Sequence, residues 1–143
     1  MKRFLILLLT FTLLSCSRDN NVNNCNFLLD VNVSAAINLN LPQFSSLQVT
    51  GSVVKLEGQG NAGIILVRRN SDTMIAWDGA DPNQPLSQCS PLTIVGVNAV
   101  SNCGQDIEYN LLTGQSIGQN QQPCTLKAYR VEFVGNNQYF VSN

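Results

Sequence analysis

From residue 31 onward, apolar residues recur at every second position of the chain. Between residues 31 and 41 they alternate with serine and asparagine, and Pro42 ends the pattern. A period of two is typical of a β-strand that buries one face. Further strand-like runs cover residues 47–56, 63–69, 73–78, 92–100, 107–111, 126–134 and 138–141. Turn-forming residues separate them, and Gly135-Asn136-Asn137 predicts a hairpin over residues 126–141.

No segment keeps the period of an amphipathic helix. We therefore predict an all-β fold, a small antiparallel barrel or sandwich with eight or more strands. The aromatic residues of the predicted strands are expected to line its core: Trp77, Tyr109, Tyr129, Phe133 and Phe140.

The beginning of the chain has a different pattern. Lys2-Arg3 precedes an apolar run over residues 4–14, and Leu13-Leu14-Ser15-Cys16 follows the pattern that a lipoprotein signal peptidase cleaves. The run is shorter than the roughly 20 residues of a permanent transmembrane helix. We predict that Cys16 becomes the first residue and carries a diacylglycerol and a further acyl chain such as palmitate. The alternative is an ordinary secretory signal with an incidental cysteine.

These patterns predict three parts: a lipoprotein signal peptide over residues 1–15, a lipidated cysteine with a flexible tether over residues 16–30, and a β domain over residues 31–143. Asparagine and serine are frequent over residues 17–26, as in flexible linkers. The predicted location is the cell envelope, with the chain anchored in lipid at the outer membrane or the periplasmic face.

Charge argues against nucleic acid as a partner. Removal of residues 1–15 would take away Lys2 and Arg3 and leave six basic and nine acidic residues. Arg68-Arg69 would then be the only adjacent basic pair. Proteins that bind nucleic acid through its phosphates carry clustered basic residues, so this class is excluded.

The chain contains no histidine. Because histidine is the side chain that titrates near neutral pH, Ser-His-Asp and Cys-His nucleophiles are excluded. Besides Cys16 there are four cysteines, Cys25, Cys89, Cys103 and Cys124. An even number outside the cytoplasm favours disulfides, with three pairings open. Their spacing contains no C-x-x-C pair, which argues against structural zinc.

Two acidic groups are candidates for chemistry. Asp106 and Glu108 stand two apart on one face of a predicted strand, as a carboxylate pair for glycoside hydrolysis would. The loop Asp78–Asn83 concentrates oxygen ligands of the kind that calcium prefers. Ordinary solvated strands and turns contain the same residues, and we favour that interpretation for both. No catalytic residue is predicted, and we do not expect an enzyme.

Several short motifs follow one another in a familiar order: Ala76-Trp77-Asp78, Pro82, Cys103, Tyr109-Asn110-Leu111-Leu112-Thr113-Gly114 and Leu126-Lys127-Ala128-Tyr129-Arg130-Val131. This order resembles the Rieske [2Fe–2S] domain family over about residues 63–141. The stretch Asn38-Leu39-Asn40-Leu41-Pro42 is similar to a subgroup of small Rieske-like bacterial lipoproteins. The resemblance implies a Rieske-like β domain with two ligand loops at one end.

The ligands of that family are mostly missing here. The resemblance places the cysteine and histidine of the first loop on Asp81 and Asn83, and those of the second loop on Cys103 and Asp106. A Rieske centre needs two thiolates and two imidazoles, so one matching cysteine is insufficient. The signal also lacks the twin-arginine motif by which folded proteins are exported. We therefore expect no cofactor and a degenerate iron–sulfur site.

Loops without a cluster need another constraint, and the resemblance implies a disulfide pairing. Cys89–Cys103 would join the two former ligand loops, and Cys25–Cys124 would join the tether to the final hairpin. In the chain-entropy model their loops are worth about 3 and about 5 kcal/mol. The alternative leaves Cys103 as a free buried thiol.

The resulting interpretation is a membrane-anchored, non-catalytic binding or structural module. Its expected partners are membrane lipid, through acylated Cys16, and an unknown envelope protein or small ligand near residues 78–83 and 104–108. The alternative is an electron-transfer protein that holds a [2Fe–2S] cluster or iron through altered ligands such as Asp81 and Cys103.

Overall fold

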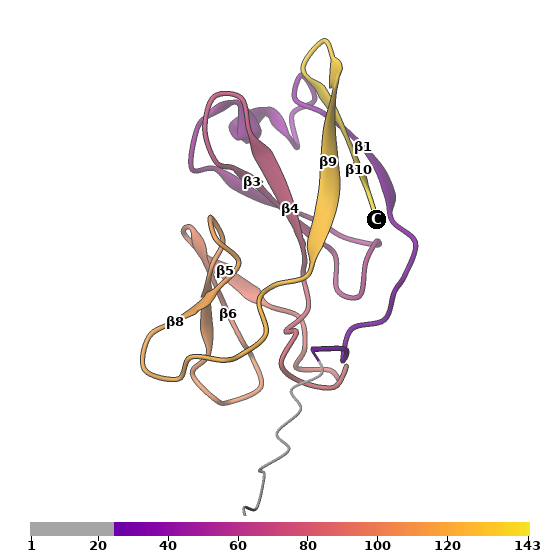
Figure 1. The fold of residues 1–143 in the computed structure, drawn as a ribbon. Coiled ribbons are helices and arrows are strands. Elements are labelled where there is room, and N and C mark those ends of the chain that lie inside the picture. The colour runs from indigo at the N-terminus through magenta and orange to yellow at the C-terminus, as the bar shows by residue number, and fades with distance from the viewer. Residues whose placement is uncertain (1–24) are drawn as a thin grey trace, which may run out of the picture.

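The strands of the protein form two antiparallel sheets (Figure 1). The structure is a computed structural model that describes residues 25–143. The predicted signal peptide, Cys16 and the first part of the predicted tether lie outside the described residues. Within the described part, no helix is both long enough and apolar enough to cross a membrane.

The larger sheet has six strands in the order β1-β10-β9-β4-β3-β2. Its strands are β1 (Ser34–Asn38), β2 (Val53–Leu56), β3 (Ile64–Arg68), β4 (Met74–Asp78), β9 (Ala128–Gly135) and β10 (Gln138–Ser142). All neighbours are antiparallel. Strand β9 follows β10 along its length but meets β4 only through Ala76↔Tyr129 and Trp77↔Ala128. The sheet therefore curls around this short junction (Figure 1).

The smaller sheet is inserted in sequence between β4 and β9. It contains β5 (Thr93–Val95), β6 (Asn98–Val100), β7 (Glu108–Asn110) and β8 (Ser116–Ile117), paired in chain order. In Figure 1 it occupies the lower left, below the larger sheet. Its strands are short, so loops make up most of the inserted segment.

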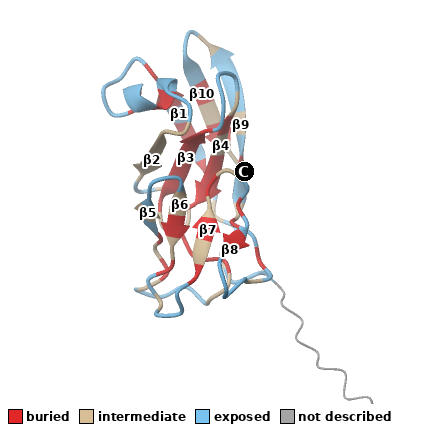
Figure 2. Ribbon diagram, turned by 90° about the vertical axis from the view of Figure 1, so that its left-hand side faces the viewer, coloured by how far each residue is buried: buried red, intermediate tan, exposed pale blue. Residues whose placement is uncertain are grey.

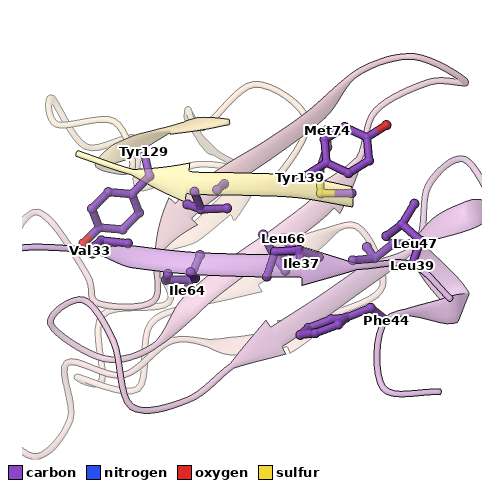
Figure 3. Close-up of a cluster of buried hydrophobic side chains, with 13 residues drawn as sticks. Val33, Ile37, Leu39, Phe44, Leu47, Ile64, Leu66, Met74, Tyr129 and Tyr139 are labelled. Atoms are coloured by element: carbon purple, nitrogen blue, oxygen red, sulfur yellow. The ribbon is translucent and has the colours of Figure 1, made fainter. Parts of the chain in front are cut away.

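One hydrophobic core lies inside the curl of the larger sheet. Alternate residues of β1 point into it, and the 3-10 helix η1 (Ser45–Gln48) contributes Leu47. Figure 3 shows Ile37 and Leu66 near the middle of this core and Leu47 toward one end. The buried members are Val33, Ala35, Ile37, Leu39, Phe44, Leu47, Ile64, Leu66, Met74, Ala76, Tyr129, Tyr139 and Val141.

A second core lies between the two sheets, and β3 contributes to both. Ile64 and Leu66 face the first core, whereas Ile65 and Val67 face the second, because successive side chains of a strand point to opposite faces. All five residues of β3 are buried, and Figure 2 draws β3 in red at the centre of the molecule. Strand β3 thus connects the packing of the two sheets.

The turn at residues 111–114 wraps around the indole of Trp77. The Trp77 Nε1–H group donates to the carbonyl of Leu111 at 2.7 Å. Gly114 has a φ of +75°, and a Cβ atom there would lie 2.7 Å from the indole ring. The motif that ends in Thr113-Gly114 therefore serves packing, since only glycine permits both the left-handed backbone and this close approach.

The all-β prediction is confirmed: residues 25–143 form ten strands, which include the predicted hairpin of β9 and β10. Strand β4, a first loop, a second loop, β7 and the closing β9–β10 hairpin follow one another along the chain in the order that the resemblance implies. Details differ. The run at 47–56 is η1 followed by β2, and the run at 92–100 is a hairpin that turns at Gly96, where φ is +62°. The sequence pattern missed β8.

The predicted aromatic core is correct for Trp77, Tyr109 and Tyr129, which are buried. It is wrong for Phe133, whose side chain is 62% exposed. Phe133 lies opposite Tyr139 in the hairpin, where the two ring centroids are 5.1 Å apart, so it covers Tyr139 from the solvent side. Phe140 is only partly buried.

Candidate functional site

Three loops meet at one end of the molecule, and we call them the tip: residues 79–92 between β4 and β5, residues 101–107 between β6 and β7, and residues 118–127 between β8 and β9. They lie in the lower half of Figure 1. The first two are the loops that the resemblance identifies as ligand loops. All the predicted ligand positions fall on the tip.

Asp81 is fully buried at the centre of the tip. The hydroxyl of Tyr109 donates to its Oδ1 at 2.6 Å, and the backbone N–H of Asn83 donates to the same oxygen at 3.0 Å. The hydroxyl of Ser101 donates to Oδ2 at 2.5 Å, with the Gln84 amide at 3.3 Å. Both carboxylate oxygens are therefore used within the protein, by donors from the first two loops and from β7.

Asn83 connects the first loop with the third. Its Nδ2 group donates to the Tyr109 hydroxyl at 2.7 Å and to the carbonyl of Cys124 at 2.8 Å. Its Oδ1 accepts the backbone N–H of Cys124 at 3.0 Å. Because an amide offers donors and an acceptor, one side chain fixes both backbone groups of Cys124.

Both predicted disulfides are present. Cys89–Cys103 joins the first two loops, with a Cα–Cα distance of 5.0 Å. Cys25–Cys124 joins the beginning of the described chain to the third loop, at 5.4 Å. The thiol alternative for Cys103 is therefore not observed. Together with Asp81 and Asn83, these bridges link all three loops of the tip to one another.

A second buried carboxylate lies at the base of the tip. Asp78 accepts the hydroxyl of Tyr129 at 2.5 Å and both the backbone and side-chain N–H groups of Asn61, at 2.9 and 2.8 Å. Its other oxygen accepts the N–H of Ala80 at 2.9 Å. Asn61 also exchanges hydrogen bonds with the backbone of Leu29, so this network reaches the segment before β1.

The two tyrosines remain neutral donors. Burial, followed by the hydrogen bond to Asp81, raises the pKa of Tyr109 well above its usual value near 10. Burial and the bond to Asp78 raise the pKa of Tyr129 in the same way. Neither carboxylate takes part in the salt bridges found among the described residues. Hydrogen bonds, rather than cations, satisfy both buried charges.

The residues at the ligand positions do not fit a [2Fe–2S] cluster. Asp81 and Asn83 bind other protein groups, the Cys103 sulfur is bonded to Cys89, and Asp106 is exposed with a φ of +48°. Thiolates and imidazoles are the ligands such a centre needs. Among the described residues, no three Cys, His, Asp or Glu side chains are grouped as metal ligands would be.

The geometry also argues against the two other candidate sites, the Asp106–Glu108 carboxylate pair and the calcium loop at Asp78–Asn83. Asp106 lies in the second loop, ahead of β7, and not on a strand face with Glu108 as predicted. Glu108 accepts a hydrogen bond from Asn98 at 2.8 Å. In the Asp78–Asn83 loop, both carboxylates point inward to tyrosine hydroxyls, where an ion bound from solvent would have to displace them.

A groove of about 520 Å³ opens beside the tip. Its wall combines the segment from Cys25 to Asp30 with Pro82 of the first loop and residues 123–127 of the third. Lys127 lies at its edge, where Nζ bonds the carbonyl of Leu29 at 2.9 Å and forms an ion pair with Asp30 at 3.2 Å. Sequence patterns missed this groove, because its two sides are about 100 residues apart in the chain and only Cys25 and Cys124 signalled their contact.

No family model matches the chain, and no curated protein matches it significantly. Among solved structures, a chain in the complex of reduced oxygenase and oxidized ferredoxin of carbazole 1,9a-dioxygenase is 17% identical, with a TM-score of 0.45; the match covers 80% of this chain and 94% of that one. A protein named as the small subunit of a nitrite reductase (NADPH) is 20% identical, with a TM-score of 0.40, over 76% of this chain and 97% of that one. These are similarities of backbone structure, and no ligand or activity is inferred from them.

Proposed function

We propose that this protein is a lipid-anchored, non-catalytic module of the cell envelope. In this proposal residues 1–15 are removed, Cys16 is acylated, and the Rieske-like domain binds or supports an envelope component without a cluster of its own. The motif around Cys16 supports the anchor. The structure of the tip supports the non-catalytic role.

The observation that carries this proposal is the occupancy of the ligand positions by protein contacts. Asp81 receives four hydrogen bonds, and Cys103 is bonded to Cys89. A site that must bind a metal or activate a nucleophile needs a group free to react, whereas these groups hold the loops together. A rigid, preformed tip on loops is suited to recognition.

Metal analysis of the purified mature protein tests the cofactor-free state. The expected result is a colourless protein with substoichiometric iron and no inorganic sulfide. Stoichiometric iron and sulfide, with the visible absorption of a [2Fe–2S] centre, would favour electron transfer through altered ligands instead.

Mass spectrometry of the N-terminal peptide tests the anchor. The expected peptide begins at Cys16 and carries the mass of a diacylglyceryl group and a further acyl chain. Cys16→Ala is expected to stay unprocessed or to lose its lipid, and Ser15→Ala is the matched control that leaves the cleavage pattern intact. An unmodified peptide that begins elsewhere would contradict the anchor.

A further inference from the structure

The described chain begins at the tip. Its indigo start lies at the lower end of Figure 1, beside the loop of residues 79–92. Cys25, the first described residue, is bonded to Cys124 of the third loop. The attachment point of everything that precedes Cys25 is therefore a tip loop, although the first strand begins only at Ser34.

This attachment continues into the interior of the tip. Both backbone groups of Cys124 bond to Asn83, whose side chain also donates to the Tyr109 hydroxyl. Tyr109 in turn donates to Asp81. The disulfide thus connects the N-terminal segment to the hydrogen-bond network of Asn83, Tyr109 and Asp81. The chain before Cys25 is therefore connected to this network through the disulfide, ahead of its connection to β1.

The connecting chain between anchor and tip is short. Eight residues separate Cys16 from Cys25. Nine extended residue steps reach at most about 30 Å. Without the disulfide, the next contacts along the chain would be the hydrogen bonds between Leu29 and Asn61, thirteen steps from Cys16, and the first strand pairing would be at Ser34, eighteen steps away. The greatest reach would rise to about 45 Å at Leu29 and to about 60 Å at Ser34.

The surface at this end suits contact with lipid headgroups. Phe27 and Leu86 expose 45% and 37% of their surfaces there. The three loops carry little charge: Asp81 is buried, Lys127 is paired with Asp30, and Asp106 is the exposed acid. Exposed apolar side chains with few charged neighbours can enter the headgroup boundary without a large desolvation cost.

We propose that the Cys25–Cys124 disulfide orients the domain so that the tip faces the lipid surface that holds the anchor. This inference rests on the proposed acylation of Cys16. It names the lipid surface as the first partner of the tip and places the β9–β10 turn and η1, at the opposite end in Figure 1, away from the membrane.

Energy transfer from tryptophan to dansyl-labelled lipid headgroups tests the orientation. The acylated full-length product is reconstituted in vesicles of phosphatidylethanolamine and phosphatidylglycerol. Leu86→Trp reports on the tip, because residue 86 is in its first loop, and Val49→Trp reports on the opposite end, because residue 49 directly follows η1. Both substitutions replace exposed apolar residues. Trp77 is the only native tryptophan and supplies the same background in each protein. We expect at least twofold more transfer from position 86 than from position 49.

The disulfide itself is tested with paired serine variants of the two tryptophan proteins. Cys25→Ser with Cys124→Ser is expected to bring the two transfer values close together, because the longer connection lets the domain turn. Cys89→Ser with Cys103→Ser is the matched control: it also removes a tip disulfide but keeps the attachment point, so the difference should persist. Circular dichroism verifies that each variant is folded.

The outcomes separate the two proposals. Protein that fails to float with the vesicles contradicts acylation, and the orientation with it. Protein that floats but transfers equally from both positions, or more from position 49, contradicts the orientation while the anchor stands. A difference that survives the loss of Cys25–Cys124 would show that another contact orients the domain.

Discussion

In the larger sheet, the first four side chains of β3 are buried in the two apolar cores, whereas the buried centre of the tip is a carboxylate surrounded by hydroxyl and amide groups. The sheet is stabilised mainly by removing apolar surface from water. The tip consists of loops. Two disulfides and the buried Asp81–Tyr109 pair hold it together, and the Asp78–Tyr129 pair lies at its base.

This difference shows how polar and covalent contacts can hold three loops together around a centre that is not apolar. The disulfides restrict the unfolded chain, and the carboxylates specify how the loops meet, because a buried charge must find its donors. The tip should therefore be sensitive to changes that leave the sheet intact. The predictions below separate the two regions, beginning with the largest expected effect.

Removal of the Cys25–Cys124 disulfide should have the largest effect. Its two cysteines are 99 residues apart, and those of Cys89–Cys103 are 14 apart. The chain-entropy model predicts losses in unfolding free energy of up to about 5 and about 3 kcal/mol for the respective double serine variants. Urea unfolding of the purified domain measures both. Equal losses, or a larger loss for Cys89–Cys103, would contradict the loop-length argument.

A matched pair on β3 tests how independent the two cores are. Ile65 and Leu66 are both fully buried neighbours, but Ile65 packs between the sheets and Leu66 packs inside the larger sheet. Each substitution to alanine should lower the unfolding free energy by about 2–5 kcal/mol. Hydrogen exchange should distinguish them: Ile65→Ala should accelerate exchange in β6 and β7, and Leu66→Ala in β1 and β10. The same exchange pattern in both variants would indicate one cooperative core.

The strands of the larger sheet were predictable because their signal is local. In β1 the alternation of Ala35 and Ile37 with polar residues matches burial directly. The same reasoning failed at 92–100, where apolar residues continue through a turn at Gly96, and at Phe133, which covers a neighbour at the end of a hairpin. A periodic pattern predicts which face of a strand is buried. It does not predict where a turn interrupts the strand or where the strand extends beyond the core.

The tip was predictable only where covalent chemistry limited the choices. Four cysteines left three pairings open, and the pairing that the resemblance implied, with one bridge between the two former ligand loops, is the one present. The hydrogen-bond partners of Asp81 could not be predicted, since Ser101 and Tyr109 come from positions 20 and 28 residues away and have no distinctive spacing. Asn61 was missed for the same reason, because its contact with Asp78 depends on the register of β3 and β4, which places Asp78 opposite Ile64.

Tyr109→Phe should destabilise the tip more selectively than Ile65→Ala or Leu66→Ala. The substitution removes the hydroxyl that donates to Asp81 Oδ1 and accepts from the Asn83 amide. The unfolding free energy should fall by about 1–3 kcal/mol, because a buried carboxylate loses a hydrogen-bond donor. Hydrogen exchange should rise in residues 79–92 and 118–127. Tyr129→Phe is the control: it removes the same kind of bond at Asp78, so its exchange should rise near Asn61. Equal exchange at residues 79–92 in both variants would contradict separate networks.

Alkaline titration tests the same hydroxyls without a substitution. The folded protein raises the pKa of Tyr109 and Tyr129 above the unfolded value near 10, so above that pH the unfolded chain releases protons that the folded chain retains. Stability is therefore complete below about pH 10 and falls above it, by about 1.4 kcal/mol per pH unit for each tyrosine. Urea unfolding between pH 9 and 11 measures the slope, with Tyr109→Phe and Tyr129→Phe each expected to reduce it by about half. Because phenylalanine has no proton to lose, an unchanged slope in both variants would assign the alkaline transition to other groups.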